Sequence, residues 1–326
     1  MLVLPLENEV LYQYIGEFNI KNQVPFESEK LPFIGEISAL SGAFLWGMTA
    51  LLFEEAGKRI GAFPTNLLRI LLASIFLCTT LFFVSGEFLP LQATHAEIFW
   101  LGMSGIVGLA IGDGALFISL VILGPRRATL LLSLAPPITA ILAWFLLGER
   151  IDLPAILGIV VTVWGIFWVV NERHVAEQTR GSKTKGVILG IISALGQAVG
   201  LILAKQGFSN GIDPLSATIL RMLPAAATLW LFALLTRQLK PIMGALSDKK
   251  ALFATLGGSV VGPYLGVWLA NVAVKHTETG VASTLLATVP ILVIPMVIIV
   301  RKTKPSMRAV VGSFIAVIGI ALLFLR

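Results

Sequence analysis

Three ionisable residues lie inside long apolar segments of this 326-residue chain: Arg69, Asp113 and Arg221. On insertion scales such a group costs about 2.5–3.5 kcal/mol at the centre of a membrane helix, so these residues are candidates for function. Asp113 is the carboxylate placed farthest inside an apolar segment, and the two arginines are its candidate partners. Asp113 is therefore either a substrate or proton-coupling site or a structural ion pair. The arginines have either a charge-coupling role or a structural one, in which their charged ends extend to the membrane–water interface.

Two prolines, Pro136 and Pro290, lie near the middle of apolar segments and are 154 residues apart. A proline inside a helix removes one backbone hydrogen bond and clashes with the preceding turn, so each predicts a kink or a break. Matched interruptions in two halves of a membrane protein indicate a central cavity between them. The alternative is a kink that sets the shape of the helix without contacting any ligand.

Further polar or aromatic side chains at mid-helix depth are candidates for lining such a cavity. With Asp113, the cavity candidates are Trp46, Thr129, Ser133, Gln197, Trp268, Asn271 and Thr284. For each of them the alternative is packing or a hydrogen bond between helices. Hydroxyl groups in membrane helices in addition often bond to a carbonyl of their own helix.

The composition excludes several classes of protein. Hydrophobic residues make up 56% of the chain and charged residues 13%, whereas about 25% of a soluble domain is charged. This excludes a soluble enzyme, a disordered chain and a nucleic-acid-binding domain. A single cysteine, Cys78, excludes an intramolecular disulfide, and the three histidines are far apart. We therefore expect no metal site and no cofactor, while a coupling ion such as a proton is possible.

Ten segments are long and apolar enough to cross about 30 Å of hydrocarbon as helices. We expect these spans at 34–54, 65–85, 97–121, 126–147, 152–171, 185–207, 213–236, 251–274, 279–300 and 306–325. Residues 1–33 mix apolar residues with five glutamates and have no basic segment before an apolar one, so we expect a poorly ordered arm rather than a cleaved signal. The fold class is an all-α integral membrane protein.

An internal repeat relates the two halves of the chain. The segment Ile37-Ser-Ala-Leu40 recurs as Ile192-Ser-Ala-Leu195, and several glycine and proline pairs match at an offset of 154. The expected organisation is a first repeat at 34–171, a loop at 172–184 and a second repeat at 185–325. Because each repeat holds an odd number of spans, the second enters the membrane from the opposite side. Two inverted five-helix repeats usually place a ligand site at their interface near the bilayer centre.

The segment Ala135-Pro-Pro-Ile-Thr-Ala-Ile-Leu-Ala-Trp-Phe-Leu-Leu-Gly-Glu149, followed by Gly158 and Gly165, resembles the EamA family of the drug/metabolite transporter superfamily. The resemblance covers about 34–325 and implies a secondary transporter of small organic metabolites. It does not identify the substrate, because members carry amino acids, sugars, nucleotide-related metabolites or toxic compounds. The second half departs from the pattern, since Arg301-Lys-Thr-Lys304 stands where the first half has Gly148-Glu149.

One function from a different class competes with transport, namely an integral membrane enzyme that acts on a lipid or polyprenyl-linked substrate. Such an enzyme needs paired carboxylates, histidine clusters or a phosphate-binding site at one interface. The loops contain no HxxxH, no DxxD and no glycine-rich phosphate loop, so the sequence favours the transporter and no enzymatic activity.

The distribution of positive charge predicts the orientation. Sixteen of the 24 Lys and Arg residues lie beside loops that follow odd-numbered spans, whereas six lie with the termini and the other loops. The positive-inside rule then places both termini outside, although relatives in the family usually resemble proteins with termini inside. We expect a multi-pass protein of the plasma or inner membrane, either a monomer or a homodimer, whose partners are the lipid bilayer and a small metabolite but no nucleic acid.

Overall fold

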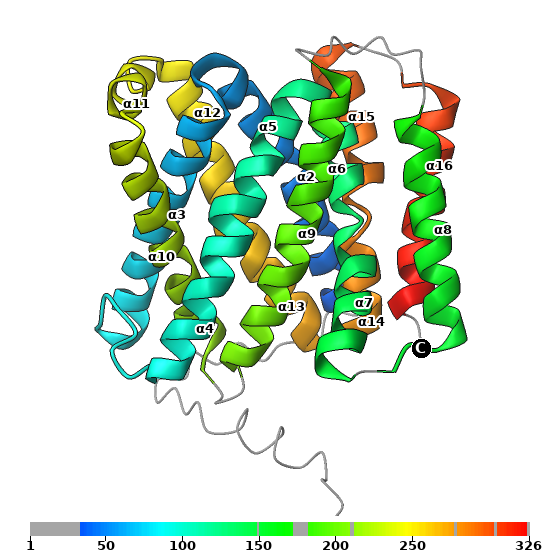
Figure 1. Cartoon of the computed structure of the whole chain (residues 1–326), viewed down its shortest axis with the longest axis horizontal. Coiled ribbons are helices and arrows are strands. Elements are labelled where there is room, and N and C mark those ends of the chain that lie inside the picture. Colours follow the sequence, from blue (N-terminus) through cyan, green and yellow to red (C-terminus); the bar gives the residue numbers. More distant parts are fainter. Residues whose placement is uncertain are drawn as a thin grey trace, which may run out of the picture. The chain divides into compact units, whose positions relative to one another are not determined.

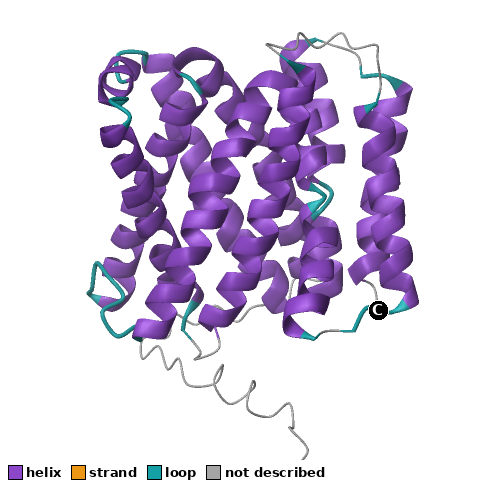
Figure 2. Cartoon of the chain, in the orientation of Figure 1, coloured by secondary structure: helices purple, strands orange, loops and turns teal. Residues whose placement is uncertain are grey.

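The computed structural model describes residues 33–148, 150–171, 182–208, 212–276, 279–302 and 305–324. The predicted arm up to residue 32, residues 172–181 of the predicted loop and Glu149 lie outside these residues. Within the described residues every regular element is a helix (Figure 2). The all-α fold class predicted from the composition is therefore confirmed.

Ten helical spans in the described part of the chain are long and apolar enough to cross a membrane, as predicted. In chain order they are α2 (Ile34–Ile60); α3 (Ala62–Ser85); α4 (His95–Gly105), η1 (Ile106–Gly112) and α5 (Asp113–Leu123); α6 (Pro125–Leu132) and α7 (Ala135–Leu147); α8 (Leu153–Val170); α9 (Lys183–Gly207); α10 (Pro214–Leu235); α12 (Lys249–Ser259), η3 (Val260–Gly266) and α13 (Val267–His276); α14 (Thr279–Leu286) and α15 (Val289–Arg301); and α16 (Met307–Phe324).

Two features differ from the predicted spans. The first helix continues six residues beyond the predicted end at 54, because its polar end is held by i,i+4 ion pairs from Glu54 to Lys58 and from Glu55 to Arg59. A short additional helix, α11 (Leu239–Ala245), lies between the seventh and eighth spans. Its seven residues are too few to give an apolar signal of membrane-spanning length.

Polar side chains just outside the apolar segments begin several of the helices. Thr94 forms a capping box with Glu97 at the start of α4, and Asp152, Asp213 and Asp248 each accept a backbone N–H at the start of α8, α10 and α12. These caps satisfy N–H groups that have no partner inside the helix. The sequence therefore encodes the helix starts locally, where the chain leaves the hydrocarbon.

The turn between the third and fourth spans depends on a glycine. Gly124 adopts a φ of 82° and Pro125 begins α6 directly after it. A positive φ suits glycine, and a proline at the first helical position loses no hydrogen bond. This confirms that two helices, rather than one continuous span, occupy residues 95–147.

The two five-span repeats have opposite directions in the membrane. The first runs from α2 to α8 and the second from α9 to α16, and because each crosses five times they start on opposite faces (Figure 1). One face of the bundle is where five helices end, namely α2, α5, α8, α10 and α15. We call it the basic face, because the loops rich in lysine and arginine follow these helices. The predicted inverted repeat is therefore present.

The first helix of each repeat packs mainly against the other repeat. Helix α2 contacts α12, η3, α13 and α15, while α9 contacts α4, η1, α5 and α7. The contacts correspond by symmetry, since Gly196 lies against Gly112 and the equivalent Gly42 lies against Gly266. These small residues let the backbones approach closely, which is how helices associate in lipid. The exchange of first helices makes the interface between the repeats the centre of the bundle.

The fifth and tenth spans form a separate pair at one edge of the bundle (Figure 1). Gly158 and Gly165 of α8 lie against Gly319 and Gly312 of α16, and any side chain at these positions would meet the backbone opposite. The Thr162 hydroxyl donates to the Ala316 carbonyl across the same contact, at 3.3 Å. The matched glycines of the repeat therefore have a packing role here.

Candidate functional site

A buried ion pair joins the second and third spans. The Arg69 guanidinium lies 2.5 Å from an Asp113 carboxylate oxygen, and the two residues expose only 7% and 6% of their surface. The Asp113 carboxylate thus points inward to a donor on another helix, as an unpaired carboxylate in hydrocarbon would be very costly. The Arg69 side chain therefore does not extend to the membrane–water interface.

Two amide side chains complete the hydrogen bonding of this pair. Asn66, one turn before Arg69 on α3, accepts from the guanidinium at 3.1 Å and is fully buried. From the second repeat, Gln197 on α9 donates to the other carboxylate oxygen of Asp113 at 2.5 Å. We call Asn66, Arg69, Asp113 and Gln197 the central polar cluster. It is built by both repeats and lies at their interface.

The third span holds this cluster through a π-helical segment, η1, that ends directly before Asp113. The cluster uses main-chain carbonyls of η1, because the Gly108 carbonyl accepts from Gln197 at 3.2 Å and the Leu109 carbonyl accepts from Asn66 at 3.4 Å. The eighth span contains a second π-helix, η3, at the position that corresponds to η1 by the repeat offset of 154. Single π-helical turns occur frequently at functional sites.

Aromatic rings enclose the Arg69 end of the cluster. The guanidinium carbon lies 5.7 Å from the centroid of Phe53 and 5.2 Å from that of Phe117, and the two rings contact each other. A cation within about 6 Å of a ring face is stabilised, the more so away from water. Both rings are almost fully buried, so water is excluded from this side of the ion pair.

Arg221, which corresponds to Arg69 in the second repeat at an offset of 152 residues, has a different environment. It lies on α10, and one of its terminal nitrogens points toward Gly108 of η1. Its Nε is buried without a hydrogen-bond partner, and no described residue forms a hydrogen bond or an ion pair with the rest of its guanidinium. The two predicted charge candidates, Arg69 and Arg221, thus lie on two helices that both pack on the span that carries Asp113.

The fourth and ninth spans are interrupted at matched positions, as the prolines predict. Residues 133–134 separate α6 from α7, residues 287–288 separate α14 from α15, and Figure 2 shows turns inside the bundle. Pro136 and Pro290 are the second residues of α7 and α15. Because a proline has no N–H, the carbonyl four residues before each of them has no donor in the helix. Pro290 is buried and Pro136 half-buried, so neither is fully exposed to lipid.

Of the remaining cavity candidates, those whose side chains the structure describes do not join the central polar cluster. Thr129 and Ser133 donate to carbonyls of their own helix, which is the alternative role for a hydroxyl in a membrane helix. The half-buried indole of Trp46 packs against Gly266 at the end of η3, and Thr284 is half-buried in α14. The structure does not describe the side chain of Asn271.

Trp268 differs from the residues of the central polar cluster in its exposure. It lies on α13, which packs on α2, and exposes 64% of its surface. Its role as a cavity residue stays a prediction.

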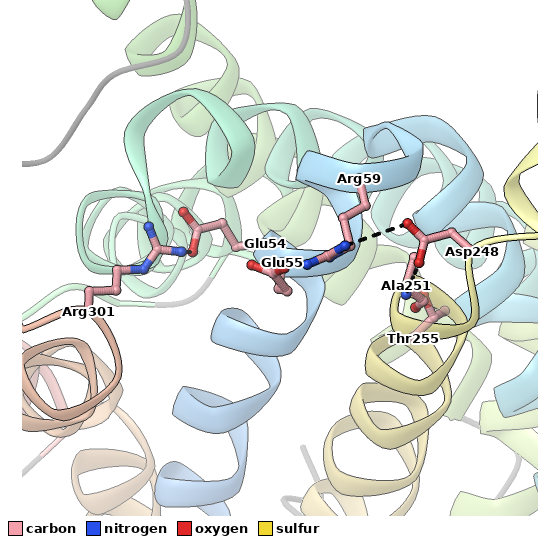
Figure 3. A network of polar contacts seen from close by, with 7 residues as sticks. All are labelled: Glu54, Glu55, Arg59, Asp248, Ala251, Thr255 and Arg301. Atoms are coloured by element: carbon pink, nitrogen blue, oxygen red, sulfur yellow. Dashed lines mark hydrogen bonds and ion pairs between the residues drawn. The ribbon is translucent and has the colours of Figure 1, made fainter.

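Ion pairs connect the two repeats at the basic face (Figure 3). The fully buried Glu54 of α2 pairs with Arg301 at the end of α15, and with Lys58 of its own helix at 2.6 Å. Arg59 lies 3.8 Å from Asp248, the residue that caps α12. The end of α2 is thus attached to both the eighth and the ninth spans.

Sequence reasoning missed Asn66, Phe53, Phe117 and Glu54. Asn66 and Arg69 are spaced i,i+3 on one helix, a signal that places the amide beside the guanidinium. Glu54 carries no comparable signal, because its partner Arg301 is 247 residues away. In the part of the chain that the structure describes, no three His, Cys, Asp or Glu side chains gather to form a metal site.

These features define a multi-pass membrane protein with two inverted five-helix repeats and a polar cluster between them. The EamA-like transporter family model matches residues 33–171 and again 184–325, so the chain belongs to this family, within the drug/metabolite transporter superfamily.

Individual relatives are distant. A relative named uncharacterized transporter YetK, from Bacillus subtilis (strain 168), is 24% identical over 169 residues, which are 52% of this chain and 51% of the relative. The chain thus matches about half the length of this relative. A crystal structure of a protein with 16% sequence identity has a TM-score of 0.61 and covers 89% of this chain and 96% of its own. At this identity the likeness supports the fold alone.

Proposed function

We propose that this protein is a secondary transporter of small organic metabolites in the plasma or inner membrane, with its substrate site beside the central polar cluster. The observation that carries the proposal is the hydrogen bond between Gln197 and Asp113, which joins the two repeats at a buried ion pair. Transporters built from inverted repeats bind substrate at the repeat interface near the bilayer centre. Polar groups at this depth are expensive, so their position favours a functional role.

The proposed mechanism is alternating access by exchange of conformation between the two repeats. The pairs of Glu54 with Arg301 and of Arg59 with Asp248 close the basic face in this conformation, because they tie α2 to α15 and α12. Opening that face requires these pairs to break. The interruptions at residues 133–134 and 287–288 supply hinges, since the helix hydrogen bonding is already broken there.

The test compares cells that produce the protein with cells that carry an empty vector. Metabolites in the cells and in the medium are measured by mass spectrometry after transfer to fresh medium. We expect the ratio of the amounts inside and outside the cells to change for at least one metabolite when the protein is present. This change should be lost when Gln197→Leu disrupts the central polar cluster. An unchanged metabolite distribution, with the protein present in the membrane, would contradict the proposal.

A further inference from the structure

The charges at the centre of the bundle do not balance. Arg69 and Asp113 form a complete ion pair, and Asn66 and Gln197 take up their further hydrogen bonds. Arg221 adds a second positive charge next to this neutral pair. No described carboxylate lies within ion-pair distance of it, and no described acceptor bonds to it.

The position of Arg221 keeps its charge inside the bundle. It lies seven residues after Pro214, so about 10 Å along the helix from the start of α10. Helix α10 packs directly on the third span, because a side chain at Gly105 would overlap the Arg221 carbonyl oxygen. A terminal nitrogen of its guanidinium faces Gly108, whose missing side chain leaves the guanidinium and the main chain of η1 next to each other.

The repeat explains why Arg221 has no partner of its own. Arg69 and Arg221 correspond at an offset of 152 residues, but the residue that corresponds to Asp113 at the offset of 154 is Val267. In the first repeat, Gly42 and Ala43 lie 155 and 154 residues before Gln197, and neither has an amide side chain. Arg221 therefore repeats the cation of the first repeat without a corresponding carboxylate or amide.

We infer that Arg221 binds the anionic group of the transported metabolite, a carboxylate or a phosphate; this rests on the proposed function. A guanidinium presents its N–H donors in a fixed fork that matches either group. An unpaired cation in a low-dielectric interior is costly, and an incoming anion removes that cost, so the site selects for negative charge. Arg69 does not serve this purpose, because Asp113 already occupies it.

The test uses purified protein in sealed lipid vesicles. The vesicles are loaded with the small-molecule extract of the host cells, to which glucose, glucose 6-phosphate, succinate, succinamide and choline are added. Release is followed by mass spectrometry, with and without a proton gradient, for wild type, Arg221→Gln, Arg221→Lys and Arg237→Gln. Arg237 follows the end of α10 and is not part of the cluster, so this variant controls for the loss of one positive charge.

We expect wild type to release solutes that carry a carboxylate or a phosphate, and Arg221→Gln to release them at least ten-fold more slowly. Arg221→Lys should keep part of the rate, and Arg237→Gln should equal wild type. Carboxylates and phosphate esters are scored separately, which identifies the anion.

Two results would overturn the inference while the transporter itself stands. One is that wild type releases only solutes without an anionic group, and this result does not depend on the folding of any variant. The other is that Arg221→Gln, eluting as a single species in size-exclusion chromatography, releases anionic solutes at the wild-type rate. If wild type releases no solute of any kind, it is the proposed function that fails.

Discussion

Among single residues, Arg69 and Asp113 determine which substitutions the centre of the bundle can accommodate. Both groups are buried, their separation is 2.5 Å, and Gln197 and Asn66 satisfy further hydrogen bonds. Such a pair contributes little net stability, because desolvation offsets the attraction between the charges. Removal of one partner is different, since it leaves a buried charge that nothing compensates.

We predict that Asp113→Asn destabilises the protein by about 3–5 kcal/mol, because Arg69 then remains buried without a counter-charge. The measurement is the thermal unfolding midpoint of purified protein in detergent. Glu87→Gln, in the turn after α3, is the matched control and should unfold like wild type. If Asp113 carries protons, Asp113→Asn instead unfolds like wild type and loses the pH dependence of transport.

The double variant Arg69→Met with Asp113→Leu tests the same pair in a second way. Replacing both charges by apolar side chains of similar size removes both the attraction between the charges and the cost of desolvating them. We therefore expect the double variant to unfold at a higher temperature than either single variant. Additive losses in this double-mutant cycle would show that the two residues act independently.

Among the helices, glycine contacts and ion pairs hold different parts of the bundle together. The α8–α16 pair packs by glycines that lie backbone to backbone, away from the central polar cluster. The end of α2 is instead attached to α15 and α12 by charged side chains. A glycine contact resists separation at all times, whereas an ion pair near the surface can break and form again.

We predict that Gly319→Ala destabilises the protein by about 1–3 kcal/mol, because its Cβ would overlap Thr162 and the backbone of α8 has to move. Gly244→Ala in α11 is the control, since no atom lies within 4 Å of the added Cβ. Equal unfolding midpoints for the two variants would contradict the packing described for α8 and α16.

We predict that Glu54→Gln opens the basic face, because Arg301 loses its carboxylate. The readout is maleimide labelling of a cysteine at Ala50, buried one turn before Glu54, in a Cys78→Ser background. We expect labelling to rise several-fold. Glu55→Gln, which removes an exposed pair with Arg59 on the same helix, should leave the rate unchanged. A rise with both variants would mean that α2 is loosened generally.

For the whole molecule, the inverted repeat and the charge distribution together predict the orientation in the membrane. Both repeats cross five times, so the described chain starts and ends on the face opposite the basic one. Loops rich in lysine and arginine are retained in the cytoplasm. The charge distribution therefore predicts that the basic face lies inside the cell.

We predict that alkaline phosphatase fused to the C-terminus is active, because this enzyme acquires its disulfides only outside the cytoplasm. A fluorescent protein inserted between residues 172 and 181 should in turn fluoresce, as this segment follows the fifth span. A phosphatase fusion that is inactive although the membrane contains it at the normal level would reverse the orientation.

The amino-acid sequence alone determined the features that depend on local or periodic signals. Runs of about 20 apolar residues require helices in a bilayer, because every backbone polar group must then be satisfied internally. The offset of 154 determined the repeat, and Pro136 and Pro290 determined the two interruptions. Asp113 could be predicted to face inward for the same energetic reason.

Only the tertiary structure decided which of these residues meet. Glu54 and Arg301 are 247 residues apart, and Gln197 and Asp113 are 84 apart, and no local signal brings such residues together. The π-helices η1 and η3, which pack on α9 and α2, have no local sequence signal either. An apolar helix surrounded by lipid shows little difference between its faces in sequence, so packing decides its rotation. Packing thereby also decides that Arg69, rather than Arg221, is the ion-pair partner of Asp113.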